Sequence, residues 1–203
     1  CAIVDAEYVG GDLDTHAEFT TATTAIGAVG DDREAVYRSG ASPGETLCVT
    51  GEWGRSAAAL RLFERETETA RDRANDLFRF PPRVADGRAL TASATAMMDS
   101  SDGLARSIHQ LAEASDVGVA LDRDAVPVHP AVDDVVDDAD ERFELAAHFG
   151  EDFELVCSMP DAAVERAREA CPAGVTRVGR VVEPTAGVTA DGDPLPDRGY
   201  THG

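Results

Sequence analysis

Asp99-Ser-Ser-Asp-Gly103 is the segment whose residue types best suit chemistry, and it lies between an expected strand at 94–98 and the start of an expected helix. Two carboxylates three residues apart at such a turn can converge on one hard cation, and free N–H groups at a helix start suit phosphate oxygens. In a chain without lysine, the pair fits Mg²⁺ that keeps its waters and a nucleotide's phosphates. Ser101 can donate to a phosphate. The alternative is structural: Ser101 or Asp102 caps the helix and Asp99 is an acid in a turn.

Two further segments combine acids with glycine. In Gly10-Gly11-Asp12 the paired glycines let the backbone approach a ligand closely, and Asp12 could be a further metal ligand. The alternative there is a plain turn. In Gly150-Glu-Asp-Phe-Glu-Leu155 the acids stand at the mouth of an expected strand, where functional residues of α/β folds usually lie. The alternative is an acidic turn whose Phe153 and Leu155 belong to the core.

Gly51-Glu-Trp-Gly54-Arg-Ser56 has the shape of a glycine-rich phosphate loop, with an expected strand before it and a helix after it. Without a lysine it offers a nest of N–H groups, and a tight strand-to-helix turn is the alternative. Arg38 is a candidate phosphate clamp, since a guanidinium group can hold phosphate through two hydrogen bonds. The alternative for Arg38 is an ion pair with a surface acid. The 5 histidines share no spacing, so neither a zinc site nor a Ser-His-Asp triad is predicted.

The charge of the chain excludes several classes of function. All 18 basic residues are arginine, and 39 acidic residues bring the net charge to −21. P-loop hydrolases, protein kinases and Schiff-base enzymes each need a lysine, so all three are excluded. The acidic excess also argues against nucleic acid or an anionic membrane surface as a partner. Acid excess with arginine in place of lysine indicates a protein kept soluble in concentrated salt.

The composition predicts a globular protein of the cytoplasm. With 203 residues and 43% hydrophobic content, the chain can bury one good core or two small ones. No apolar run approaches the roughly 20 residues that cross a bilayer. Since none of the cysteines forms a Cys-x-x-Cys pair, buried reduced thiols are expected rather than a zinc or redox site. The cysteines are Cys1, Cys48, Cys157 and Cys171.

The alternation of elements predicts an α/β or α+β fold. Residues 19–29, rich in Thr, Ile and Val, predict a long strand. Turn formers at 38–44 predict a boundary between a domain tail at 1–40 and a domain at 41–203. The other expected strands are 46–50, 94–98, 117–122, an alternating half-buried strand with Phe153, Leu155 and Cys157, and 176–182, with a hairpin about Asp191-Gly192. Four helices are expected. The first has Ser56 as its cap and carries Ala57, Leu60 and Phe63 on one face, and the second runs from Leu104 to near Gly118 with Ile108 and Leu111 inward. The other two occupy 143–147 and 162–170.

A series of segments, read in order, resembles the thiamine-monophosphate kinase family. The segments are Gly10-Gly-Asp12, Arg38-Ser-Gly-Ala-Ser-Pro-Gly44, Val49-Thr-Gly51 with Gly54, Pro82-Arg83, Asp99-Ser-Ser-Asp-Gly103, Gly150-Glu-Asp-Phe-Glu-Leu155 and Gly199-Tyr-Thr-His202. The family is similar to aminoimidazole ribonucleotide synthetase and selenophosphate synthetase, a superfamily that binds ATP without a P-loop. The resemblance implies that 41–203 is the superfamily's C-terminal α/β sandwich domain, preceded at 1–40 by the tail of the N-terminal ATP-binding domain.

The resemblance also implies an activity, which is transfer of the γ-phosphoryl group of ATP to thiamine monophosphate, giving thiamine diphosphate and ADP. It implies homodimers made through the N-terminal domains, and a role for each matching position. Asp12, Asp99 and Asp102 would hold Mg²⁺; Gly11, Arg38 and Ser101 would bind ATP; Glu151 and Tyr200 would contact the thiamine moiety.

The chain departs from the family pattern at identifiable places. The family's chain begins earlier, with a further domain that carries a metal and nucleotide motif. Phe149 stands where the family has the first glycine of Gly-Gly-Glu-Asp, and Gly203 stands where it has a final aromatic residue. Two alternatives stay open on the residues: another superfamily enzyme with a different substrate, or a non-catalytic acidic domain that binds a ligand or partner.

Overall fold

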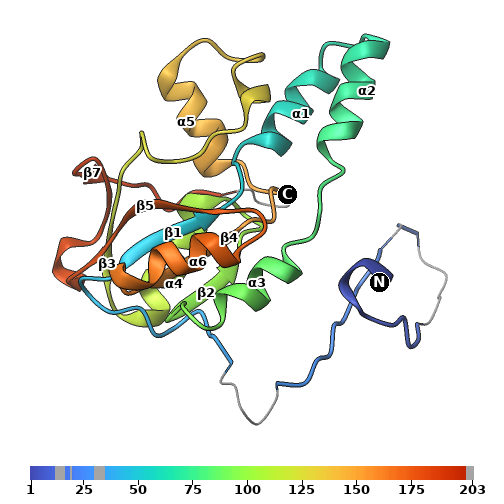
Figure 1. Cartoon of the computed structure of the whole chain (residues 1–203). Helices are drawn as coiled ribbons and strands as arrows, with labels where there is room; N and C mark the ends of the chain where they lie inside the picture. The colour runs from blue at the N-terminus through green and yellow to red at the C-terminus, as the bar shows by residue number, and fades with distance from the viewer. Residues whose placement is uncertain (12–16, 19, 30–34, 200–203) are drawn as a thin grey trace. The chain divides into compact units, whose positions relative to one another are not determined.

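The computed structural model describes residues 1–11, 17–18, 20–29 and 35–199 (Figure 1). Contacts divide the chain into two units, Cys1–Ala35 and Val36–Gly203. In the first unit, the regular element among the described residues is the short 3₁₀ helix η1 (Ala2–Val4). The prediction of a strand at 19–29 is wrong for residues 20–29, which form no strand and are exposed. A strand needs the backbone groups of a neighbouring strand, and none of the described residues supplies them.

The second unit is built on a seven-stranded sheet with the order β2-β4-β1-β5-β3-β6-β7. Neighbouring strands are antiparallel except for the parallel pair β3 and β6. The strands are β1 (Thr46–Thr50), β2 (Ala96–Asp99), β3 (Gly118–Leu121), β4 (Leu155–Met159), β5 (Val175–Val182), β6 (Val188–Ala190) and β7 (Asp193–Pro194). This mixed sheet with helices confirms the predicted α/β class, and the strand pair β6 and β7 confirms the hairpin about Asp191-Gly192.

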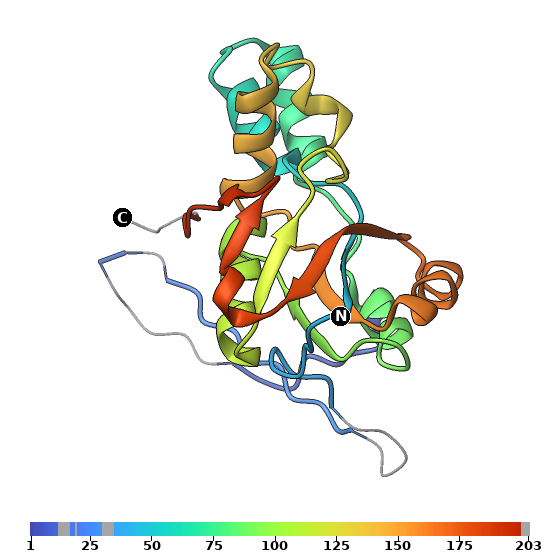
Figure 2. The same cartoon turned by 90° about the vertical axis from the view of Figure 1, so that its left-hand side faces the viewer.

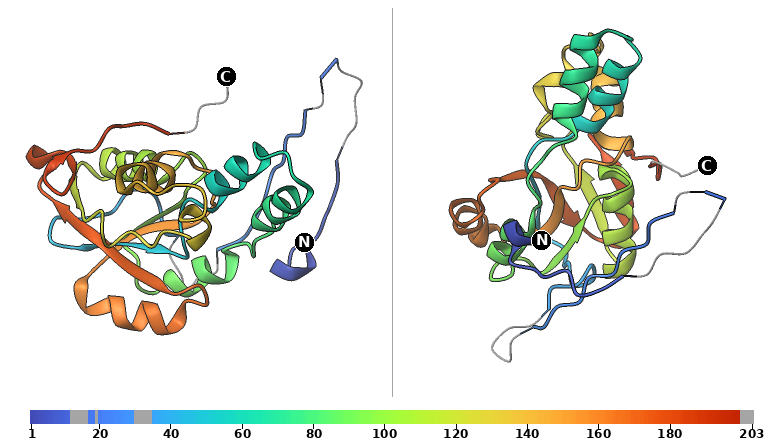
Figure 3. Two further views of the ribbon diagram at one scale, coloured as in Figure 1. Left: turned by 90° about the horizontal axis from the view of Figure 1, so that it is seen from above. Right: turned by 90° about the vertical axis from the view of Figure 1, so that its right-hand side faces the viewer.

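Helices cover both faces of this sheet and also extend beyond one end of it. The α-helices are α1 (Arg55–Phe63), α2 (Glu68–Leu77), α3 (Val84–Leu90), α4 (Leu104–Ser115), α5 (Ala139–His148) and α6 (Val164–Ala170). Short 3₁₀ helices are η2 (Pro130–Val132), η3 (Asp161–Ala163) and η4 (Pro184–Ala186). Figures 2 and 3 show α4 and α6 on opposite sides of the sheet and α1, α2 and α5 grouped past its end.

The alternation of side chains along β1 explains the two layers of core. Leu47 and Val49 are buried against the α4 side, in the cluster that includes Ile108 and Leu111. Cys48, between them in sequence, points to the other face and packs with residues of α3 and α6. Because successive side chains of a strand point to opposite faces, a strand covered on both sides has to be apolar throughout. β1 is buried at all its positions for this reason.

Local patterns predicted several elements well and missed two details. β1 has the predicted bounds, and α4 begins at Leu104 with the predicted Ile108 and Leu111 inward. The prediction that Ser56 caps α1 is wrong, because the N-cap residue is Gly54 and Ser56 lies buried within the first turn. Leu60 is exposed rather than on the buried face, since α1 buries its alanines and Leu62 against α2 and α5 instead.

The prediction of a half-buried strand starting at Phe153 also needs correction. β4 begins at Leu155 and is buried throughout, because it lies between β2 and β1 inside the sheet with helices on both faces. Phe153 precedes the strand, has a positive φ of 51° and is 38% exposed.

Two loops meet at the edge of the sheet where β2 ends and β4 begins. The loop from β2 to α4 and the loop before β4 approach so closely at Gly150 that a Cβ atom there would lie 2.5 Å from the carbonyl oxygen of Ser101. Gly150 also has a φ of +90°, a conformation that other residues adopt only with strain. Glycine is therefore required at this position both by the conformation and by the space.

We predict that Gly150→Ala lowers the free energy of unfolding by about 3 kcal/mol or more, combining about 1–2 kcal/mol for left-handed backbone with a similar cost of overpacking. Gly174→Ala is the matched control, because Gly174 has a φ of +75° but nothing within 4 Å of a Cβ atom. It should cost only the backbone part. Urea denaturation of both variants measures the difference, and equal losses would contradict the close contact of the two loops.

Candidate functional site

Asp99 and Asp102 lie at the C-terminal end of β2 and in the turn that follows it, just before α4. Asp99 is the last residue of β2 and is exposed, and Asp102 is half-buried. The N-cap residue of α4 is Gly103, and no side chain forms a capping hydrogen bond there. This removes the structural alternative in which Ser101 or Asp102 is an ordinary cap. The two carboxylates and Ser101 thus precede a helix start that has no side-chain cap and whose first residues, Leu104 and Ala105, are buried.

Ser100, which follows Asp99, holds the loop between β2 and α4 in place. Ser100 is completely buried, and its hydroxyl accepts a hydrogen bond of 2.8 Å from the hydroxyl of Ser107 on α4. The Ser101 hydroxyl donates to Oδ1 of Asp102 at 3.2 Å. Short side chains bonded to the helix and to each other leave the loop little freedom, so the acids are presented on a fixed backbone.

The loop before β4 is joined to this segment by main-chain hydrogen bonds. The N–H of Glu151 donates to the carbonyl of Ser101 at 2.7 Å, and that of Phe153 donates to the carbonyl of Ser100 at 3.1 Å. The N–H of Ser100 in turn donates to the carbonyl of Glu154 at 2.9 Å. The structure therefore brings Ser101 and Glu151, two predicted site residues, to the same place, although they are fifty positions apart in the sequence.

Asp152, next to Glu151, connects the same loop to the turn between β1 and α1. Its carboxylate accepts from the N–H of Gly54 at 2.6 Å and from the N–H of Ser56 at 2.9 Å. Two N–H groups of the glycine-rich turn thus point at the protein's own carboxylate. The phosphate-loop interpretation of Gly51-Glu-Trp-Gly54-Arg-Ser56 is therefore wrong, and the tight-turn alternative holds. Burial raises the pKa of Asp152, while the N–H groups of Ser56 and Gly54 lower it.

A buried ion pair lies beside this turn, between Arg83 and Glu154. The guanidinium donates from Nε and Nη2 to the two carboxylate oxygens at 2.7 and 2.6 Å, and the Thr50 hydroxyl adds a bond of 2.7 Å. These bonds to Glu154 raise the pKa of Arg83 above its ordinary value. A buried carboxylate with this many donors is fully satisfied, so Glu154 orders the start of β4 and is not free for a ligand.

An aromatic pair joins this loop to the segment before α3. Phe80 and Phe153 stack with ring centroids 5.9 Å apart, and the guanidinium carbon of Arg55 lies 3.9 Å from the centroid of Phe80. A cavity of about 370 Å³ opens next to it, lined in part by Arg55, Arg83 and His129. Burial lowers the pKa of His129, which favours a neutral imidazole.

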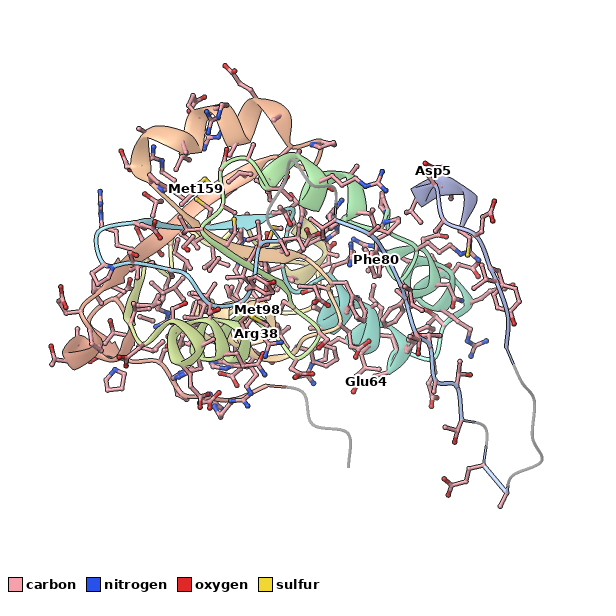
Figure 4. All side chains as sticks on the ribbon, turned by 90° about the horizontal axis from the view of Figure 1, so that it is seen from below. Asp5, Arg38, Glu64, Phe80, Met98 and Met159 are labelled. Atoms are coloured by element: carbon pink, nitrogen blue, oxygen red, sulfur yellow. The ribbon has the colours of Figure 1, made fainter. Side chains whose placement is uncertain are left out.

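The remaining predicted site residues are placed as follows. The carbonyl of Tyr37 accepts a 2.8 Å hydrogen bond from the N–H of Met97, so Arg38 runs alongside β2, and Figure 4 shows it beside Met98. Arg38 is exposed, and its guanidinium has no ion pair within the described part of the chain. Gly11 belongs to the first unit. Asp12 and Tyr200 lie outside the described residues, although Gly199, just before Tyr200, packs against the backbone of Asp102.

Other kinds of site are not formed by the residues that the structure describes. No group of three or more His, Cys, Asp or Glu side chains is close enough to hold a metal, so Asp99 and Asp102 are at most part of a ligand set. Among those same residues, no helix is long and apolar enough to span a membrane. Cys48, Cys157 and Cys171 are buried free thiols and Cys1 is exposed. Burial raises the pKa of Cys48 to about 12, so its thiol stays protonated at neutral pH.

The sequence patterns did not predict the roles of four residues of the site, which are Arg55, Ser56, Asp152 and Glu154. Each lies in a segment that carried a signal: Arg55 and Ser56 in the glycine-rich turn before α1, and Asp152 and Glu154 in the acidic segment before β4. The signal could not say which acid is buried and bonded and which remains accessible. That distinction depends on partners about a hundred positions away in the sequence.

Comparison with known proteins identifies the family. Residues 42–191 match the family described as AIR synthase related protein, C-terminal domain. The thiamine-monophosphate kinase of Halobacterium salinarum is 57% identical over 203 residues, and that of Methanospirillum hungatei is 38% identical over the same number. Both alignments cover 100% of this chain but only 67% and 65% of those proteins.

Solved structures agree with the sequence relatives. A crystal structure of thiamine-monophosphate kinase from Stenotrophomonas maltophilia matches with a TM-score of 0.71 and 29% identity, over 81% of this chain and 55% of that chain. A structure of AaThiL complexed with AMPPCP and TMP matches with a TM-score of 0.70 and 28% identity, over 82% and 54%. The predicted resemblance and fold are confirmed. The chain belongs to the thiamine-monophosphate kinase family, and its second unit has the fold of the AIR synthase related C-terminal domain.

Proposed function

We propose that a protein containing this chain transfers the γ-phosphoryl group of ATP to the phosphate of thiamine monophosphate, forming thiamine diphosphate and ADP. The observation that carries the proposal is the meeting of the Asp99–Asp102 loop with the loop of Glu151 at one edge of the sheet. The relative with 57% identity is a thiamine-monophosphate kinase, and the AaThiL structure was solved with AMPPCP, an analogue of ATP, and TMP. The chain spans about two thirds of the length of these thiamine-monophosphate kinases.

Each predicted site residue has a role in this proposal. Asp99 and Asp102, with Asp12, hold Mg²⁺, because carboxylate oxygens are its preferred protein ligands and both described acids stand before an uncapped helix N-terminus. Bound Mg²⁺ would neutralise the charge of the phosphates. Ser101, Arg38 and Gly11 bind ATP through hydroxyl, guanidinium and backbone N–H groups. Glu151 and Tyr200 contact the thiamine moiety.

The transfer itself asks little covalent chemistry of the protein. An oxygen of the acceptor phosphate forms a bond to the γ-phosphorus while the bond from that phosphorus to the oxygen of the β-phosphate breaks, and ADP leaves. The attacking oxygen is already anionic, so no general base is assigned. The protein's contribution is to hold two anions in line, which in this lysine-free chain falls to arginine, backbone N–H groups and the acids that bind metal.

We propose the cytoplasm as the place of action, supported by the three buried free thiols. A homodimer is also part of the proposal and rests on the family resemblance alone. Salt adaptation is supported by the net charge of −21 without lysine and by the 57% identity to a protein of Halobacterium salinarum.

The function is tested by offering acceptors to the full-length protein with ATP and Mg²⁺ in concentrated KCl. We expect thiamine diphosphate and ADP in equal amounts from thiamine monophosphate, measured by chromatography, and no product from thiamine or from aminoimidazole ribonucleotide precursors. Thiamine has no phosphate to accept the γ-phosphoryl group in line. The ribonucleotide precursors carry a phosphate but lack the thiamine moiety that Glu151 and Tyr200 contact in this proposal. No turnover of thiamine monophosphate would overturn the proposed function.

Asp99→Asn and Asp102→Asn test the metal assignment. Each removes one carboxylate from the Mg²⁺ ligand set, so we expect the Mg²⁺-dependent affinity for ATP to fall about tenfold or more. Isothermal titration with ATP at several Mg²⁺ concentrations measures the loss. Asp137→Asn is the control, since Asp137 is an exposed acid of the loop before α5. Unchanged affinity in both site variants would show that these acids do not hold the metal.

Salt dependence follows from the charge. Like charges repel in the folded state and salt screens this repulsion, so raising KCl from dilute buffer to molar concentration should raise the melting temperature by at least about 5 °C, or about 2 kcal/mol at this size. Calorimetric scans give the value, and parallel scans in sucrose separate screening from solute exclusion. Full stability in dilute buffer would contradict salt adaptation.

A further inference from the structure

We propose that Ser56 and Asp152 are positioning residues that set the direction of the Glu151 side chain by fixing the backbone of its loop on the N-terminal turn of α1. The inference rests on the proposed function, in which Glu151 contacts the thiamine moiety. It adds a determinant of substrate binding that lies on α1 and touches no substrate.

Glu151 is held from both sides through its main chain. Its N–H donates to the carbonyl of Ser101 at 2.7 Å, and its own carbonyl accepts from the hydroxyl of Ser56 at 2.7 Å. One bond ties Glu151 to the segment with the metal-binding acids, and the other ties it to α1. Its position relative to the proposed nucleotide site is therefore set by these two bonds.

The backbone of this loop is strained, which makes the restraints necessary. Glu151 has a φ of 61° and Phe153 a φ of 51°, both in the left-handed region that non-glycine residues seldom adopt. Such conformations persist where surrounding contacts impose them, and they concentrate at functional sites. Without the bond from Ser56, Glu151 is free to return to an ordinary φ, which would swing its side chain away.

Asp152 supplies the second restraint. It is 2% exposed, its carboxylate binds the N–H groups of Gly54 and Ser56, and its carbonyl accepts from Nη2 of Arg55 at 2.9 Å. Ser56 is 0% exposed. Since water cannot replace partners at this depth, the network either forms as a whole or leaves buried polar groups unpaired.

The direction of the Glu151 side chain depends on the backbone of its loop. Among the ion pairs of the described residues none involves its carboxylate, whereas its main chain is bonded on both sides. The adjacent acids behave differently, because Asp152 is bound to the turn and Glu154 is bound to Arg83. Of these three acids only Glu151 remains for a substrate, and its neighbours determine where it points.

The experiment is a double-mutant cycle in the full-length protein, with Ser56→Ala, Glu151→Gln and the pair together. We expect Ser56→Ala to raise KM for thiamine monophosphate about threefold to tenfold, the equivalent of one hydrogen bond, with KM for ATP and kcat within about twofold. Glu151→Gln should raise the same KM, and in its background Ser56→Ala should add little. Asp152→Asn, which keeps the shape but replaces one carboxylate oxygen by a donor, should act in the same direction as Ser56→Ala.

Ser158→Ala is the matched control. Ser158 lies on β4, away from the loop, is equally buried, and its hydroxyl oxygen lies 2.7 Å from that of Thr95 in a hydrogen bond. It should lower the melting temperature and leave KM for thiamine monophosphate unchanged. An unchanged KM in both Ser56→Ala and Asp152→Asn, or effects that multiply with Glu151→Gln, would overturn the positioning role alone. An unchanged KM in Glu151→Gln would instead overturn the substrate role of Glu151 in the proposed function.

Discussion

The candidate site depends on the contact between the carboxylate of Asp152 and the N–H groups of Gly54 and Ser56. The carboxylate is buried where an isolated charge would be very costly, and it is stabilised because two N–H groups at the start of α1 point at it. The same contact satisfies donors that a helix N-terminus otherwise leaves open. One interaction thus fixes the turn between β1 and α1, the loop before β4 and, through the neighbouring residue, the direction of Glu151.

The antiparallel arrangement of β2, β4 and β1 brings the segments of the candidate site together. β2 and β1 both end, and β4 between them begins, at the same edge, so Asp99, Thr50 and Leu155 lie close together. Three segments that are widely separated in the sequence therefore supply the site from adjacent strands. The buried pair of Arg83, the N-cap residue of α3, and Glu154 lies at the same edge. Because both of its charges are paired, the pair orders the start of β4, whereas Asp99 is exposed and Asp102 is half-buried.

Sequence patterns predicted those parts of the fold in which the cause is local. The Asp99–Gly103 segment was located because a small-residue strand and a helix with an apolar stripe flank it, and α4 has the predicted inward face. The strand expected at 19–29 failed for residues 20–29 because pairing needs a second strand. Likewise Ser56 has the composition of a cap, but its hydroxyl bonds Glu151 across the fold.

By itself, the sequence determined the α/β class, the candidate acids and the chemistry left to a chain without lysine, since these follow from composition and short-range periodicity. The tertiary structure alone decided which of these acids are bound by other parts of the protein. The carboxylates of Asp152 and Glu154 are bound by partners at the starts of α1 and α3, whereas those of Asp99, Asp102 and Glu151 are not. The physical reason is that a carboxylate's role depends on the donors around it, and here those donors come from distant parts of the chain.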